Sequence, residues 1–109
     1  MAIKDTIESD VQNIKGVKVY DYDDKDAAGN AKEITDQGKL EIDNKTGKIS
    51  WTANDPANWH GKHLKMFIDT TLINTPKLLD YLNKDTSMIE IPNEAHFLFN
   101  KEDIPSNIT

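Results

Sequence analysis

The chain has 109 residues, of which 37% are hydrophobic and 29% charged, a composition typical of one globular domain rather than a disordered segment. Its formal net charge of −6 disfavours a nucleic-acid role, because contacts to phosphates require a basic surface. The sequence contains no cysteine, which excludes disulfides, thiolate metal sites and cysteine nucleophiles.

The sequence shows neither a signal peptide nor an apolar run of the roughly 20 residues needed to cross a bilayer. It also lacks a lysine-rich amphipathic segment suited to an anionic membrane. We therefore expect no membrane insertion in this segment. If the native protein is exported, we expect this chain to be an excised piece of it.

The first residues are predicted to form a short amphipathic helix. Residues 1–13 carry apolar side chains at intervals of four and three, and Gly16 would end the helix. The apolar positions are Ile3, Ile7, Val11 and Ile14. Residues 17–22, VKVYDY, then alternate and predict a strand with Val17 and Val19 on one face, in phase with Asp21.

A hairpin over residues 39–52 is the clearest structural prediction. Leu40 and Ile42 alternate with charged residues in the first run, and Ile49 and Trp51 alternate with polar residues in the second. Gly47 lies in the connection, where a bulged hairpin loop requires a positive φ. The four apolar side chains are expected on one face, with Trp51 in the core.

Short elements are predicted along the rest of the chain. Residues 23–30 form an acidic turn and residues 34–38 a second turn, and a helical turn near Pro56 is capped by Asn54 or Asp55 and stopped by Gly61. Residues 63–73 form a strand, and residues 76–84 a helix with Thr75 as its N-cap. Its leucines Leu78, Leu79 and Leu82 are expected to pack inward. Residues 88–91, 96–100 and 104–109 are predicted to be extended.

Short strands separated by regular turns favour a mainly-β fold, an immunoglobulin-like β-sandwich with short connecting helices. We expect residues 1–109 to form one such domain. An α+β layer arrangement is the alternative.

Two metal-binding hypotheses are weak. The acidic run at Asp21, Asp23, Asp24 and Asp26 invites a calcium interpretation, but an EF-hand register that starts at Asp24 places Ala28 and Thr35 at two of its ligand positions. His60 and His63 resemble a metal pair, yet no third ligand follows at a suitable spacing. We therefore predict no metal and no cofactor, and a small metal-binding domain using His60 and His63 stays the alternative.

Catalysis is disfavoured, because the serines lack a context that would activate them and no phosphate-binding loop is present. Trp51, Trp59 and Phe67 could form a stacking platform for a glycan. Trp59 lies in a loop and is expected to be exposed, so it is the candidate ligand-binding residue.

Several blocks in order resemble a family, the isopeptide-forming repeat domains of Gram-positive cell-wall-anchored adhesins, in the antigen I/II and fimbrial-subunit class. The blocks are the VKVYD strand with its acidic turn, the GK-x-x-W-T-A and W-x-GK segments over residues 47–62, IPNEA at residues 91–95, and Ser106–Asn107. The resemblance covers about residues 15–109, and it implies a β-sandwich in a secreted, wall-linked protein with an LPXTG-type anchor.

The resemblance also implies a covalent clamp. In such domains a lysine on an early strand condenses with an asparagine on the last strand, assisted by a buried acid. A desolvated lysine is neutral and nucleophilic, and a protonated carboxyl polarises the amide. Asn107 is the matching asparagine and Asn93 a second possibility, whereas the lysine and the acid are expected upstream of this chain.

The expected function is therefore non-enzymatic, in adhesion or as a stalk segment on the bacterial cell surface. The chain would be the later part of a larger repeat domain, would contact neighbouring repeats of the same protein, and would be monomeric. An adhesive module would bind a host surface protein or glycan near Trp59 and the acidic turn.

Overall fold

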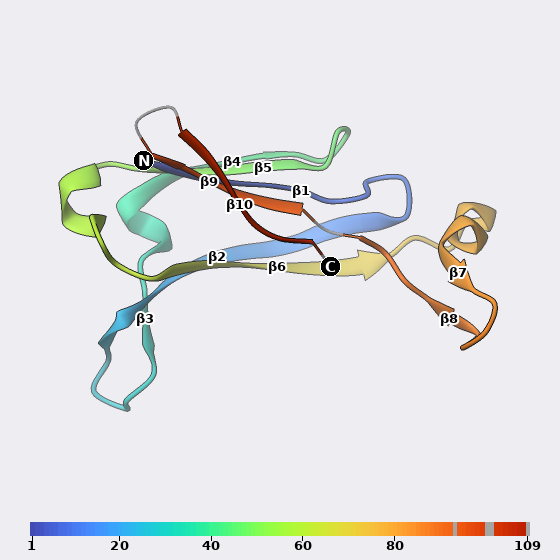
Figure 1. The fold of residues 1–109 in the computed structure, drawn as a ribbon, viewed down its shortest axis with the longest axis horizontal. Helices are drawn as coiled ribbons and strands as arrows, with labels where there is room; N and C mark the ends of the chain where they lie inside the picture. The colour runs from blue at the N-terminus through green and yellow to red at the C-terminus, as the bar shows by residue number, and fades with distance from the viewer. Residues whose placement is uncertain (93, 100–101, 109) are drawn as a thin grey trace.

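Two antiparallel sheets form the body of the molecule in the computed structural model, which describes residues 1–92, 94–99 and 102–108, with side chains for residues 1–92 (Figure 1). The five-stranded sheet has the order β10-β9-β1-β5-β4, and the three-stranded sheet has the order β3-β2-β6. The strands of these two sheets are β1 (Ala2–Thr6), β2 (Gln12–Lys25), β3 (Ala31–Glu33), β4 (Gly38–Asp43), β5 (Lys48–Ala53), β6 (Leu64–Leu72), β9 (Glu94–Phe99) and β10 (Glu102–Ile108).

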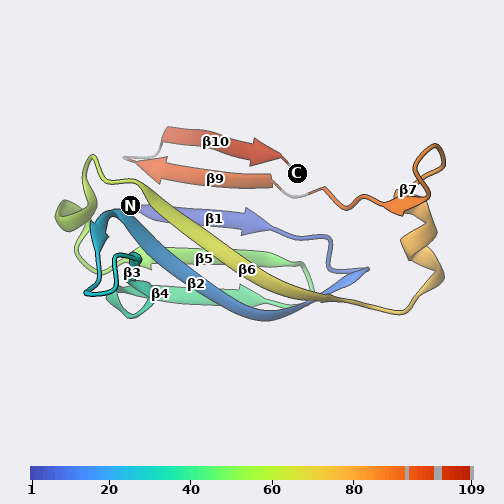
Figure 2. The ribbon, with the colours of Figure 1, turned by 90° about the horizontal axis from the view of Figure 1, so that it is seen from below.

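The remaining elements are short and lie between the strands. A separate pair, β7 (Leu82–Asn83) and β8 (Met88–Ile89), projects from one end of the sandwich (Figure 1). The helical segments are the 3₁₀ turns η1 (Thr35–Gln37), η2 (Pro56–Trp59) and η3 (Pro76–Tyr81). The two sheets lie face to face as two layers (Figure 1), and β2 and β6 cross in front of the five-stranded sheet in Figure 2, which confirms the prediction of a mainly-β fold with short connecting helices.

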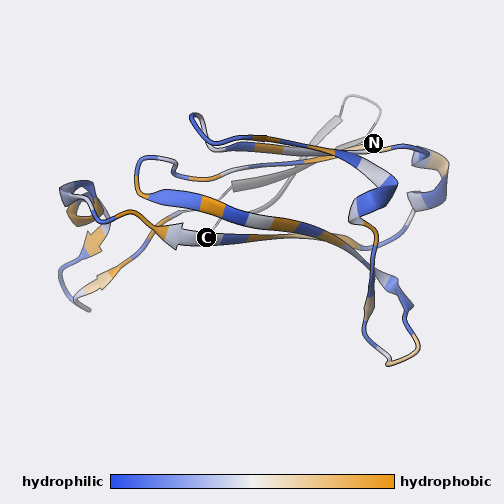
Figure 3. Cartoon of the chain, turned by 180° about the vertical axis from the view of Figure 1, so that it is seen from behind, coloured by the Kyte–Doolittle hydropathy of each residue, from blue (hydrophilic) through white to orange (hydrophobic). Residues whose placement is uncertain are grey.

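The core lies between the two sheets, because β1, β2, β5 and β6 each turn one set of alternating side chains inward. Figure 3 shows this alternation of hydrophobic and hydrophilic residues along β2 and β6. The inward set joins both sheets in one cluster: Ile3, Val19, Ile34, Trp51, Ala53, Trp59 and Leu64. A second cluster continues it toward the other end with Ile7, Val17 and Ile49.

The predicted N-terminal helix is wrong, since these residues form β1 and the start of β2. Ile3 pairs with Trp51 of β5 on one side and with Phe97 of β9 on the other, so β1 is a central strand. A spacing of four fits a strand as well as a helix, because four is also a multiple of two. Ile3, Asp5 and Ile7 are buried in alternation, and the sheet supplies hydrogen-bond partners on both edges.

The predicted hairpin is confirmed as β4 and β5, with Leu40 opposite Trp51 and Ile42 opposite Ile49. Gly47 has φ +76°, and a side chain there would collide with the carbonyl oxygen of Ile7. Ile49 and Trp51 are buried as expected. Ile42 is 41% exposed, near the end of β4, which is the edge strand of its sheet.

The later elements agree with the sequence in position and differ in detail. Thr75 caps η3 through its hydroxyl, which accepts a hydrogen bond from the Lys77 amide, but Leu79 is 66% exposed rather than packed inward. Asp55 precedes η2 without a side-chain capping bond. The strand predicted over residues 96–100 is β9, and Asn93 and Asn100 lie outside the described residues.

Gly38 is required by its contact with Trp51. A Cβ at this position would overlap the indole ring, which is fully buried and cannot move away. We expect Gly38→Ala to lower the free energy of unfolding by about 1–3 kcal/mol, as for other overpacked cores. Denaturant unfolding would measure the change.

Gly16→Ala is the matched control, because nothing lies within 4 Å of a Cβ built there. We expect its unfolding free energy to stay within about 0.5 kcal/mol of the original. Equal destabilisation by the two substitutions would contradict a specific role for the contact between Gly38 and Trp51.

Candidate functional site

The residues singled out in the sequence fall in two regions of the fold. Trp59, the acidic turn and the histidines lie at the end of the sandwich where β2 leaves the core and the η2 loop enters β6. Asn107 lies in β10, at the edge of the five-stranded sheet. The fold thus brings most of the candidate polar residues together, and places Asn107 apart from them.

Trp59 is buried, so its predicted exposure is wrong. The η2 turn, followed by Gly61 with φ +74°, folds the segment back over the core, and only 6% of Trp59 is exposed. Its ring packs in the cluster that contains Ile34 and Leu64. A ring in this position cannot serve as an open stacking platform for a glycan.

The indole N–H of Trp59 has no hydrogen-bond partner among the described residues, although it is buried. It borders a hollow of about 250 Å³ whose polar lining includes Asp21, Asn58 and Lys62. The Lys62 ammonium lies 5.9 Å from the centroid of the Trp59 ring, a cation–π distance. Trp59 therefore fills the core at this end of the sandwich, and the Lys62 ammonium lies over its ring.

Asp21 is the most buried charged group of this region, with 1% exposure. One carboxylate oxygen accepts a hydrogen bond from the Asp23 amide at 2.9 Å, and the other lies 3.2 Å from the Lys62 ammonium. The alternation of β2 turns Asp21 inward with Val17 and Val19, as the sequence indicated. A buried carboxylate needs such partners, because desolvation of an unpaired charge is costly.

His63 forms an ion pair with Asp23 rather than a metal pair with His60. Its Nδ1 lies 3.0 Å from one oxygen of the Asp23 carboxylate, and its amide donates to the other oxygen at 2.8 Å. The hydrogen bond to Asp23, and then the charge of Asp23, raise the pKa of His63 above its ordinary 6.5. The same hydrogen bonds from the His63 ring and amide lower the pKa of Asp23 below 3.8.

In the described part of the chain, no group of three or more histidines and carboxylates is arranged to hold a metal ion. The acidic turn has a structural use instead. The Asp26 carboxylate accepts hydrogen bonds from the amides of Ala28 and Asn30, within the hairpin that joins β2 to β3. It therefore acts as a turn-forming side chain.

Among the described residues, no helix is long and apolar enough to span a membrane.

Asn107 shares a row of the five-stranded sheet with a buried acid. Asn107 pairs with Ala95 of β9, and Ala95 pairs with Asp5 of β1. Asp5 is only 6% exposed, on the face of β1 that also carries Ile3 and Ile7 into the core. The side chain of Asn107 lies outside the described part of the structure. Sequence analysis missed Asp5, because residues 1–13 were assigned to a helix.

The sequence analysis also missed an aromatic surface on the outside of the three-stranded sheet. Tyr20 and Phe67 contact each other there, with ring centroids 5.6 Å apart at an angle of 80°. Phe67 is 50% exposed, although it was considered together with the tryptophans that prove to be buried. The alternation along this strand indicated the exposure of Phe67, since Leu64, Met66 and Ile68 occupy the other face of β6.

No protein-family model matches the chain, and no curated protein shows significant similarity to it. The function must therefore be inferred from the arrangement of the residues and from the resemblance of the sequence blocks.

The pair between His63 and Asp23 predicts a pH dependence. Because the pKa of His63 is raised, its contribution to stability is complete below pH 6.5 and is lost as the pH rises through the folded-state pKa. Because the pKa of Asp23 is lowered, its contribution is present above pH 3.8 and is lost as the pH falls through the folded-state value. The pair thus contributes most between these two limits.

An NMR titration of the His63 ring would test this pair. We expect a pKa above 6.5 in the original protein, and a value closer to 6.5 in Asp23→Asn. Asp24→Asn is the matched control, since the Asp24 carboxylate lies near Lys32 rather than His63. An equal fall of the His63 pKa in both variants would assign its shift to the negative charge of the whole turn instead of to the direct contact with Asp23.

Removal of the lysine partner of Asp21 should destabilise the fold. Lys62→Met would leave one oxygen of a buried carboxylate without its partner, and we expect a loss of about 1–3 kcal/mol in the free energy of unfolding. Lys39→Met removes the lysine of an exposed pair with Glu41 and should change it by less than about 1 kcal/mol. Similar losses in both variants would show that the burial of Asp21 is unimportant.

Proposed function

We propose that this chain is a non-enzymatic spacer module of a bacterial cell-wall-anchored surface protein, one that lies outside the cell and transmits tension between neighbouring modules. The sequence blocks that resemble wall-anchored adhesins suggest the setting. The observation that carries the mechanical role is the arrangement of β1 and β10 on the two sides of β9 in one sheet.

This arrangement resists tension because β1 and β10 both run antiparallel to β9 and hence parallel to each other. Figure 2 places the N-terminus at the start of β1 and the C-terminus at the far end of β10, so a pull on the two termini is directed along the strands. Hydrogen bonds in an antiparallel ladder are perpendicular to the strands. A pull along the strands therefore loads all hydrogen bonds of the ladder together, and they do not break one after another.

A covalent clamp at Asn107 is part of the proposal. Asn107 and Asp5 are separated by one strand in the same row, so their backbones lie about 10 Å apart. Ala95 lies between them in the row, and the lysine amine would have to reach this row. Attack of that amine on the Asn107 amide would form an isopeptide bond and release ammonia, with the buried Asp5 carboxyl as the assisting acid.

The proposal thus assigns the assisting acid to Asp5, although the sequence alone suggested an acid upstream of the chain. The lysine still has no candidate among residues 1–92, because every lysine there is exposed and none is desolvated. We therefore propose that a neighbouring segment of the native protein supplies it.

A spacer is favoured over an adhesive head at Trp59. The burial of Trp59 removes the stacking platform that the sequence suggested near the acidic turn. The charged side chains around it are paired within the chain, Asp21 with Lys62 and Asp23 with His63. That end of the sandwich is therefore better suited to a rigid connection than to capture of a ligand.

Intact-mass measurement on a chain extended upstream by its native neighbouring residues tests the proposal. We expect a mass lower by one ammonia, and a fragment that links the upstream lysine to Asn107 after proteolysis. Asn107→Ala and Asp5→Ala should restore the full mass. Asn54→Ala, at an exposed position outside the row, is the matched control and should keep the deficit.

A full mass in the extended protein would overturn the clamp. Force spectroscopy on the same protein would then test the remaining mechanical role. Unfolding at a force no higher than that of a sandwich pulled across its strands would overturn the spacer function as well.

A further inference from the structure

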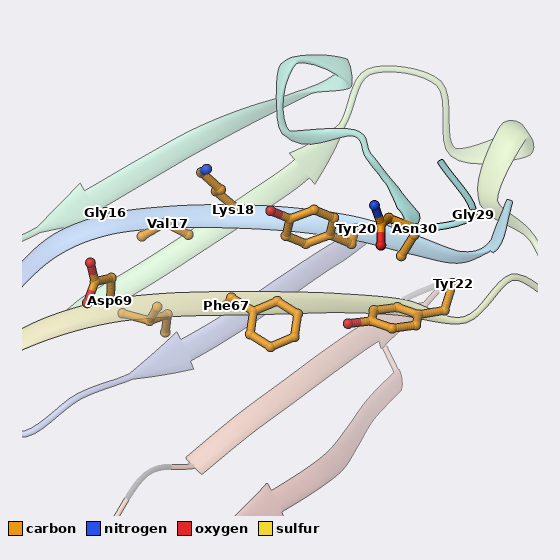
Figure 4. A pocket seen from close by; sticks show the side chains of 11 residues that line it. Gly16, Val17, Lys18, Tyr20, Tyr22, Gly29, Asn30, Phe67 and Asp69 are labelled. Atoms are coloured by element: carbon orange, nitrogen blue, oxygen red, sulfur yellow. The ribbon is translucent and has the colours of Figure 1, made fainter. Parts of the chain in front are cut away.

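A groove of about 830 Å³ lies on the face of β2 and β6 that points away from the core (Figure 4). It follows from strand phase: β2 turns Val17 and Val19 inward, so Lys18, Tyr20 and Tyr22 point outward. The hairpin after β2 forms one wall of the groove through Gly29, Asn30 and Ala31, and Phe67 of β6 lies beside the tyrosines.

The centre of the groove is an aromatic platform. Phe67 is half exposed, and the Tyr20 ring meets it nearly at a right angle, with the centroids 5.6 Å apart. Tyr22 lies at the rim, where the Lys65 ammonium sits 4.6 Å from its ring centroid. Tyr20 and Phe67 thus keep apolar ring surface available on a sheet face where exposed positions are usually polar.

The polar side chains around this platform supply both hydrogen-bond donors and hydrogen-bond acceptors. Lys18 supplies donors, Asp69 supplies acceptors, and the Asn30 amide supplies both. Figure 4 shows Asp69 toward one end of the row of rings and Asn30 toward the other. Lys18 and Asp69 line the groove, and the ammonium groups of Lys65 and Lys25 lie 4.6 Å and 5.5 Å from the Tyr22 ring centroid at its rim.

We propose that this groove binds a saccharide. A sugar ring presents an apolar C–H face that packs on an aromatic ring, and hydroxyl groups that each donate and accept hydrogen bonds. The aromatic rings match the C–H face, and the donors and acceptors around them match the hydroxyl groups. A proline-rich peptide, which lacks N–H donors at its prolines, would leave the acceptors of Asp69 and Asn30 unused.

This inference does not depend on the spacer function, because the groove lies on the other sheet from β1, β9 and β10. A protein that forms no clamp could still bind a sugar here, and a spacer without a sugar site would still carry tension.

The test is an NMR titration of the whole chain with cello-, chito- and manno-oligosaccharides and with lacto-N-tetraose, each up to about 10 mM, which covers weak carbohydrate affinities. We expect at least one sugar to shift the amide signals of β2 and β6 around the groove. Saturation of the protein's aromatic protons should transfer to the C–H protons of that sugar.

Variants localise the site. Phe67→Ala should weaken binding at least about tenfold, and Phe67→Tyr, which keeps the ring, should retain it. Gly16→Leu should also weaken binding, because Gly16 lines the groove and open space surrounds its Cβ position. Ile42→Ala, which removes an exposed apolar side chain from β4 on the other sheet, is the matched control and should bind normally.

Three results would overturn the proposal. The first is the absence of shifts at the groove with every sugar. The second is a response of the same signals to a proline decapeptide but to no sugar, which would make the groove a peptide site. The third is a shift of these signals with protein concentration alone, which would assign the surface to a second copy of the chain.

Discussion

The buried indole of Trp51 fixes the relation between the two sheets. It projects from β5 into the space between the layers, where it is fully buried, and packs in one cluster with Ile3 of β1 and Val19 of β2. Its N–H donates to the Thr35 carbonyl at 2.9 Å, in the turn that carries the chain from one sheet to the other. Gly38 leaves the space that the ring occupies. One side chain therefore sets both the packing and the crossover.

A second set of contacts closes the end of the sandwich. The Thr35 hydroxyl accepts a hydrogen bond from the Val19 amide at 2.9 Å, which ties the crossover turn to β2. Farther along β2, Asp21 and Asp23 hold Lys62 and His63 at the start of β6. The polar residues that first suggested a binding site thus join strands, and this rigidity is what a spacer under tension would use.

The local sequence pattern was sufficient for several strands that bury one face. Alternation predicted the strands around Val17 and Val19, the hairpin that contains Trp51 and the strand that contains Phe67, because burial of one sheet face enforces a period of two. It failed at residues 1–13, where a spacing of four fits both periods. Only the pairing of Ile3 with strands distant in the sequence decides between them.

By itself the sequence determined the class of the fold, the position of the main hairpin and the absence of thiol chemistry, since these depend on composition and on neighbouring residues. The tertiary structure alone decided that Trp59 is buried and which polar residues meet. Trp59 lies inward because Gly61 and η2 fold its loop over the core, and Phe67 lies outward because the other face of β6 covers that core. The exposure of a residue depends on what packs against it, and the local spacing of residues does not determine which distant strands come into contact.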